Sequence, residues 1–182
     1  ITTYFSKNIS MGLMDVMLKR RSTRKFGDEQ ITKEELDKIL QAALLAPTSM
    51  NRKPCNIMVV ERAETLEKLS KSKNHGADLI KGANKAIVVI ADTMIADTWC
   101  EDSSIALTYM HLMATELEVG SCWVQIHLRS KDGIDSEEIV RDILKIDNHY
   151  RIVGILALGH SEDIPKPRKE ADIDKSRIHF LV

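Results

Sequence analysis

Apolar residues recur every three or four positions along much of the chain, which predicts amphipathic helices. We expect helices over residues 12–21, 32–46, 63–70, 78–82, 101–118 and 136–144. Thr32 and Glu35 have the spacing of a capping box, and Pro47 stops the helix that they open. The longest predicted helix, 101–118, is apolar around much of its circumference, which favours a central buried helix that Gly120 ends.

Short runs of apolar, mainly β-branched residues lie between these helices and predict strands. The runs are 56–60, 86–91, 121–126 and 150–158. Helices come first and then alternate with strands, an order that favours an α+β sandwich over a simple doubly wound sheet. A terminal apolar segment, 178–182, is expected to pair with a sheet edge of the same subunit or of a partner.

Bulk properties indicate one globular domain. The 182 residues include 26 basic and 27 acidic side chains, so the net charge of −1 gives no general attraction to nucleic acid or to an anionic membrane. The three widely spaced cysteines predict free thiols in a reducing cytoplasm. No membrane span or signal peptide is evident. We expect residues 1–11 to be an N-terminal arm or a remnant of expression, and 12–182 to form the domain.

Five cations surround two hydroxyls in residues 19–25, and Arg20, Arg21, Ser22 and Arg24 are the candidates for chemistry. An arginine fork matches two phosphate oxygens at once, and a serine can add a hydrogen bond. The simpler interpretation is a solvated basic end of a helix that suits the helix dipole. A second basic stretch, Lys166–Lys169, is either a solvated tail or the far side of the same phosphate site.

The segment after Pro47 is rich in hydroxyl and amide groups, which could contact a heteroaromatic ring or a sugar chain. A turn that stops a helix has the same composition. Gln125 ends a predicted strand, where ligands often bind in layered folds. The six histidines lack metal-ligand spacing, and His111 is interpreted as a core or interface residue. The chain has no GxGxxG, Walker A or GxSxG motif, which argues against a Rossmann dehydrogenase, a P-loop NTPase and an α/β-hydrolase.

These pieces, in this order, resemble the FMN-dependent nitroreductase family in its short, single-domain form. The resemblance runs over residues 14–180 and rests on four motifs: 20–26, 46–54, the strand start at 120–123, and Gly159-His160 followed by 166–168. It implies a nitroreductase-like α/β sandwich with a mostly antiparallel central sheet flanked by helices, in an intertwined homodimer with FMN at the interface.

The resemblance also implies roles for individual residues. The first arginine segment would hold the phosphate and the pyrimidine side of the flavin, the loop after Pro47 would come from the partner subunit, and the strand near Gln125 would approach the reactive nitrogen. The implied cofactor-binding residues are Arg20, Arg21, Ser22, Arg24, Pro47, Thr48, Ser49, Met50, Asn51, Val124, Gln125, Ile126, Gly159, Lys166 and Arg168. No catalytic acid or base and no metal is implied.

Three features of the chain depart from the family pattern. Lys53-Pro54-Cys55 stands where Gln-Pro-Trp is frequent, and Ile126 stands where glycine is common. The chain also has little room for the insertion that larger members carry around the substrate channel, so that a lid would be built from 71–85 or the channel would be open. The implied activity is transfer of a hydride from NADH or NADPH to FMN, followed by ping-pong reduction of a small acceptor such as a nitroaromatic or quinone. The alternative is a flavin-binding or storage protein without turnover.

Overall fold

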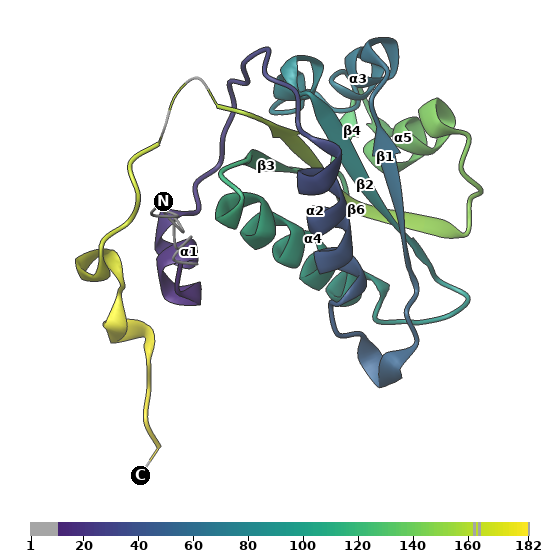
Figure 1. The fold of residues 1–182 in the computed structure, drawn as a ribbon. Coiled ribbons are helices and arrows are strands. Elements are labelled where there is room, and N and C mark those ends of the chain that lie inside the picture. The colour runs from purple at the N-terminus through teal and green to yellow at the C-terminus, as the bar shows by residue number, and fades with distance from the viewer. Residues whose placement is uncertain (1–10, 162, 164, 182) are drawn as a thin grey trace, which may run out of the picture.

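The computed structural model of the chain describes residues 11–161, 163 and 165–181. Its centre is an antiparallel sheet in the order β1-β2-β6-β3 (Figure 1). The strands are β1 (Cys55–Val60), β2 (Lys85–Asp92), β6 (Tyr150–Gly159) and β3 (Gly120–Gln125). The expected α+β sandwich with an antiparallel sheet is therefore confirmed.

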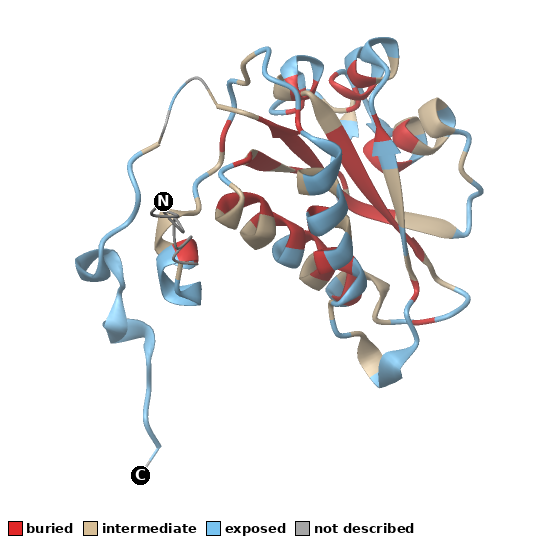
Figure 2. Cartoon of the chain, viewed as in Figure 1, coloured by how far each residue is buried: buried red, intermediate tan, exposed pale blue. Residues whose placement is uncertain are grey.

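Helices cover both faces of the sheet, which is why β2 and β6 are apolar along nearly their whole length (Figure 2). Ile87 and Val89 face α2 (Lys33–Leu44) and α4 (Trp99–Glu116). Val88 and Ile90 face the opposite layer, which contains α3 (Ala63–Leu69), the short 3-10 helix η2 (Asp78–Gly82) and α5 (Ser136–Leu144). Each face thus has its own core.

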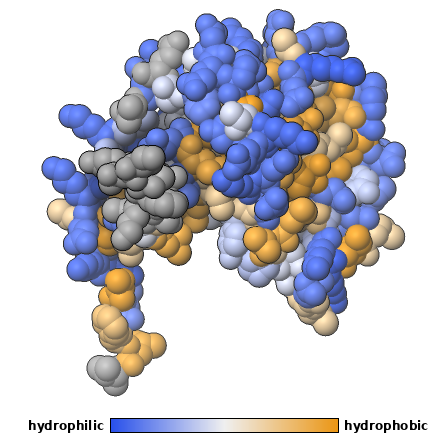
Figure 3. Space-filling model, in the orientation of Figure 1, coloured by the Kyte–Doolittle hydropathy of each residue, from blue (hydrophilic) through white to orange (hydrophobic). Residues whose placement is uncertain are grey.

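The first helix and the C-terminal segment lie beside this body rather than within it (Figure 1). Helix α1 (Leu13–Lys19) buries only Val16, and the C-terminal segment carries two single-turn 3-10 helices, η3 (Glu170–Asp172) and η4 (Lys175–Arg177). The apolar side chains at the end of this segment are exposed, with Phe180 83% accessible, and form the protruding orange end in Figure 3. In the part of the chain that the structure describes, this tail adds no strand to the sheet of its own subunit.

Most predicted elements are present with bounds shifted by no more than two residues. The capping box at Thr32 and Glu35 is formed, with both reciprocal hydrogen bonds. The two-residue strands β4 (Ser130–Lys131) and β5 (Ile134–Asp135) and the 3-10 turn η1 (Ser49–Asn51) were not predicted. Nearly all of the expected N-terminal arm, residues 1–10, lies outside the described residues.

Gly120 does not end the long helix, as the sequence had suggested. The left-handed residue after α4 is Glu118, with φ 62°, and Gly120 instead opens β3 opposite Gly159. A Cβ on Gly120 would lie 2.8 Å from both the Gly159 carbonyl oxygen and Thr23 Cγ2. Close approach of three backbone segments, rather than helix termination, therefore requires glycine here.

The expected lid, 71–85, contributes to the core in its second half, whereas Lys71 and residues 74–76 are exposed. Ala77, Ile80 and Ala83 are buried against the sheet, so this half of the segment is fixed. No described helix combines the length and the apolar composition that crossing a bilayer requires.

Candidate functional site

Two basic motifs far apart in the sequence meet where the end of α1 lies beside the C-terminal segment. Arg21 Nη1 donates to the carbonyl oxygen of Lys166 at 2.5 Å, across 145 positions of sequence. Arg168 donates from Nη1 to the Arg20 carbonyl oxygen at 3.1 Å and from its backbone N to the Leu18 carbonyl oxygen at 2.8 Å. We call Arg20, Arg21, Lys166 and Arg168 the cation cluster.

The positive charges of the cation cluster are not balanced by ion pairs within the described part of the chain. Partial burial, together with the charges of Arg168 and Arg21, lowers the pKa of Arg20. In the described ranges, no carboxylate forms a salt bridge with any of the four residues. Like charges held together without a counter-charge are stabilised when an anion binds, and arginine forks suit a phosphate.

A buried histidine contacts the guanidinium of Arg20. His111 Nε2 lies 3.1 Å from Arg20 Nη1, and His111 Nδ1 lies 2.5 Å from Ser121 Oγ. His111 is 7% exposed and Ser121 is 1% exposed. The sequence indicated a core or interface histidine here and gave no sign of its contact with Arg20.

Ser22 and Arg24 lie along the free edge of β3. Ser22 forms a parallel bridge with Ser121, and the Thr23 amide donates to the Ser121 carbonyl oxygen at 2.9 Å. Burial raises the pKa of the Cys122 thiol, although Arg24 and other nearby cations act to lower it. Cys122 is therefore a neutral thiol beneath a positively charged surface, consistent with a structural role.

Lys73 is a member of this surface that sequence reasoning missed. Its Nζ donates to the Gln125 carbonyl oxygen at 3.0 Å, and burial and the charge of Arg129 lower its pKa. The charge of Lys73, like that of Arg24, also acts to lower the pKa of the Cys122 thiol. The only sign of it in the sequence was its place in the segment considered as a lid.

The end of β3, which was expected to approach the flavin, has few groups free to contact a ligand. Val124 and Ile126 are buried, and the amides of Ile126 and His127 both donate to the Val153 carbonyl oxygen. The left-handed backbone that favours glycine occurs at Leu128, with φ 58°, rather than at Ile126.

Gly159 has a packing role. A Cβ at this position would lie 2.8 Å from Phe26 Cδ1. The residue therefore allows the segment at Phe26 to approach the end of β6, and any contact of Gly159 with a cofactor stays a prediction.

The loop after Pro47 is not brought to the cation cluster within one subunit. It lies beyond the C-terminal end of α2, far from α1 in the fold (Figure 1). The Ser49 amide donates to Asp102 Oδ1 at 3.0 Å, and the Lys53 amide donates to Thr48 Oγ1 at 3.0 Å. Met50 and Asn51 have left-handed backbone, so this is a fixed turn with exposed side chains at its tip.

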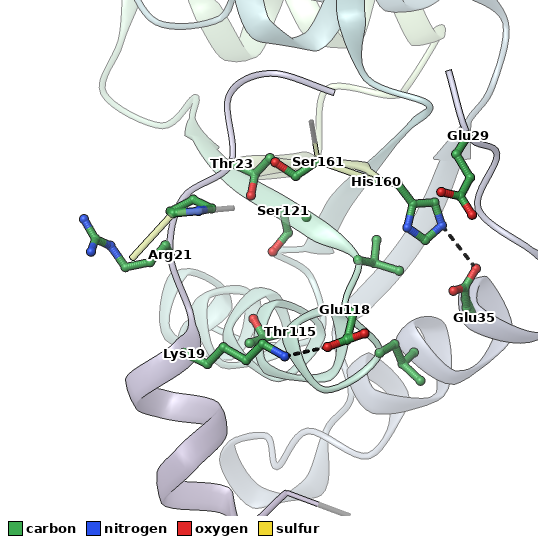
Figure 4. A pocket seen from close by; sticks show the side chains of 14 residues that line it. Lys19, Arg21, Thr23, Glu29, Glu35, Thr115, Glu118, Ser121, His160 and Ser161 are labelled. Carbon is green, nitrogen blue, oxygen red and sulfur yellow. Dashed lines mark hydrogen bonds and ion pairs between the residues drawn. The ribbon is translucent and has the colours of Figure 1, made fainter. Parts of the chain in front are cut away.

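A pocket of about 450 Å³ shares Arg21 with the cation cluster and is also lined by Thr23 and Ser121 (Figure 4). Glu29, Glu35 and Glu118 line it; Lys19 pairs with Glu118 at 2.8 Å and His160 with Glu35 at 3.7 Å. Because three carboxylates line the pocket and Lys19 is already paired with one of them, it suits a phosphate less well than the rest of the cation cluster does.

Comparison with known proteins agrees with this architecture. The profile of the Nitroreductase family matches residues 17–99 and 70–160, and therefore spans most of the chain. The chain belongs to the nitroreductase family. A family relative from Archaeoglobus fulgidus, provisionally named NADH dehydrogenase/NAD(P)H nitroreductase, is 33% identical over 91% of this chain and 95% of its own length.

Structures of family members superpose closely. An FMN-dependent nitroreductase from Clostridium difficile R20291 has a TM-score of 0.90 and 40% identity, covering 92% of this chain and 98% of its own. A nitroreductase-like protein from Desulfovibrio desulfuricans, determined with FMN, has a TM-score of 0.73 and 21% identity, covering 94% and 99%; at that identity it shows the fold alone.

Proposed function

We propose that this nitroreductase-family chain is an FMN-dependent oxidoreductase that passes electrons from NADH or NADPH to a small acceptor such as a nitroaromatic or quinone. The observation that carries the proposal is the cation cluster, in which two distant basic motifs converge with no ion-paired carboxylate among the residues that the structure describes. The names of the relatives from Archaeoglobus fulgidus and Clostridium difficile support the same activity.

The residues present fit FMN. Arg20 engages one of its five N–H donors with His111, which leaves donors for phosphate oxygens, and Arg168 is tied to the backbone of the same turn. Bound FMN would supply the hydride chemistry, and the protein would orient it and tune its electrostatics. Arg24 and Lys73 would place positive charge near the pyrimidine edge, where the reduced ring carries negative charge.

The active unit in this proposal is a homodimer. The turn containing Thr48, Ser49 and Asn51 has an exposed tip and lies at a distance from the cation cluster of its own subunit, so it would contribute to the partner's site. The apolar tail end, from Ile178 to Leu181, would be covered by the partner.

The test is an anaerobic titration of the purified, flavin-loaded dimer with NADH and with NADPH, followed by the flavin absorbance. We expect at least one nucleotide to bleach the flavin, and one equivalent of a quinone or nitroaromatic to restore the colour. Bound flavin that neither nucleotide bleaches would support the flavin-storage alternative. A colourless protein that takes up no FMN would reject both.

A further inference from the structure

We propose that His111 is a positioning residue of the cation cluster, whose neutral imidazole holds the Arg20 guanidinium in place for the phosphate of the flavin. This inference rests on the proposed function and adds to it a residue that lies behind the site rather than in contact with the cofactor.

The hydrogen bonds fix the protonation state of the imidazole. An arginine can only donate, so His111 Nε2, 3.1 Å from Arg20 Nη1, must be the acceptor. His111 Nδ1 then carries the proton and donates to Ser121 Oγ at 2.5 Å. Burial and the charge of Arg20 lower the pKa of His111 to about 4, so this neutral tautomer persists at neutral pH.

Arg20 needs such an anchor because its own helix gives it little support. Helix α1 is seven residues long and buries only Val16, and Arg20 follows its last residue. His111 comes from the long central helix and Ser121 from a strand of the sheet, so the relay connects Arg20 to the rigid body of the protein. A guanidinium already held in its binding position loses less conformational entropy when the anion arrives.

Two substitutions of His111 separate its contact with Arg20 from its contact with Ser121, which makes a selective test possible. A glutamine amide can reach the position of Nε2 and keep an acceptor for Arg20. An asparagine amide reaches only the position of Nδ1, so it keeps the contact with Ser121 and loses the one with Arg20. These two variants are polar, similar in size and opposite in the predicted effect.

The experiment is equilibrium dialysis of the full-length protein and its variants against FMN and, separately, against riboflavin, which lacks the phosphate. For His111→Asn we expect FMN affinity to fall roughly ten-fold, as for a lost hydrogen bond to a charged group, while riboflavin affinity changes less than about two-fold. His111→Gln should retain the affinity of the wild type for both flavins.

Two controls separate positioning from stability. Thr115→Val removes a hydrogen bond of 2.9 Å to the His111 carbonyl oxygen on the same helix, and it should not change the preference for FMN over riboflavin. In an Arg20→Ala background, His111→Asn should cause no further loss of FMN affinity.

Equal loss of FMN and riboflavin affinity in His111→Asn, or the same loss with and without Arg20, would overturn the inference while leaving FMN binding by the wild type intact. A wild type that binds no FMN would overturn the proposed function and this inference together. If His111→Asn does not fold, a ten-fold loss of FMN preference in His111→Gln, which keeps the acceptor, would also contradict it.

Discussion

The buried His111 should make the protein lose stability as the pH falls from 7 to 5. The group is neutral when folded, with a pKa lowered to about 4 by burial and by Arg20, whereas in the unfolded chain it titrates near 6.5. Below pH 6.5 the unfolded state therefore binds more protons than the folded state, and acid favours unfolding. The effect grows as the pH falls and levels off only below pH 4, where His111 is protonated in the folded state as well.

The difference between the folded and unfolded pKa values of His111 sets the size of this loss of stability. With those two pKa values the destabilisation is about 0.2 kcal/mol at pH 7 and about 2 kcal/mol at pH 5, a difference of roughly 2 kcal/mol. Glu137 does not contribute between pH 7 and pH 5. Burial acts to raise its pKa, but hydrogen bonds from Arg151, the Ile152 amide and His127 lower the pKa of Glu137 to about 2. Its contribution is lost only as the pH falls below about 4.5.

The assay is urea unfolding at pH 7, 6 and 5, followed by the fluorescence of Trp99 and Trp123. Protein concentration must be constant because a dimer's stability depends on it, and the series is run in excess FMN and without it. His111→Gln, which has no titrating group there, should lose about 2 kcal/mol less than the wild type between pH 7 and pH 5. Parallel curves for the two proteins would refute the assignment of a neutral, buried His111.

Three further outcomes are expected. Arg20→Ala should weaken FMN binding by about 1.5–3 kcal/mol, on the order of 10- to 100-fold, and unchanged affinity by dialysis would remove Arg20 from the site. Deletion of residues 178–182 should weaken the proposed dimer because it removes the exposed apolar side chains of Ile178, Phe180 and Leu181 that the partner would cover; sedimentation that still shows an intact dimer would contradict this role. Lys145→Gly should stabilise the protein by about 0.5–1 kcal/mol, since Lys145 caps α5 with φ 59°; an unchanged urea midpoint would argue against strain there.

Periodicity in the sequence predicted the large elements because each is long enough to show its repeat. The two-residue strands β4 and β5 are too short for an alternation of period two to be visible. Gly120 was misinterpreted because a glycine after a helical run is normally a cap, whereas here contacts with Thr23 and Gly159 decide its place. Such contacts join residues far apart in sequence and leave no local pattern.

The basic motifs of the site were visible in the sequence as separate clusters. Their meeting, through Arg21 and Lys166, depends on how the C-terminal segment crosses α1, which spacing cannot reveal. His111 and Lys73 were missed as site residues for a different reason. A single histidine within an apolar helix has the pattern of a core residue, and a lysine in a polar segment has the pattern of a solvated one.

Three hydrogen bonds join the C-terminal segment to the end of α1 and the two residues that follow it: Arg168 to Leu18, Arg168 to Arg20, and Arg21 to Lys166. An anion bound by cations of both segments would link the N-terminal and C-terminal parts of the chain. Release of the flavin should then be coupled to local unfolding of both segments. The rate at which a protease cleaves near the chain ends would therefore report the fraction of the protein that has flavin bound.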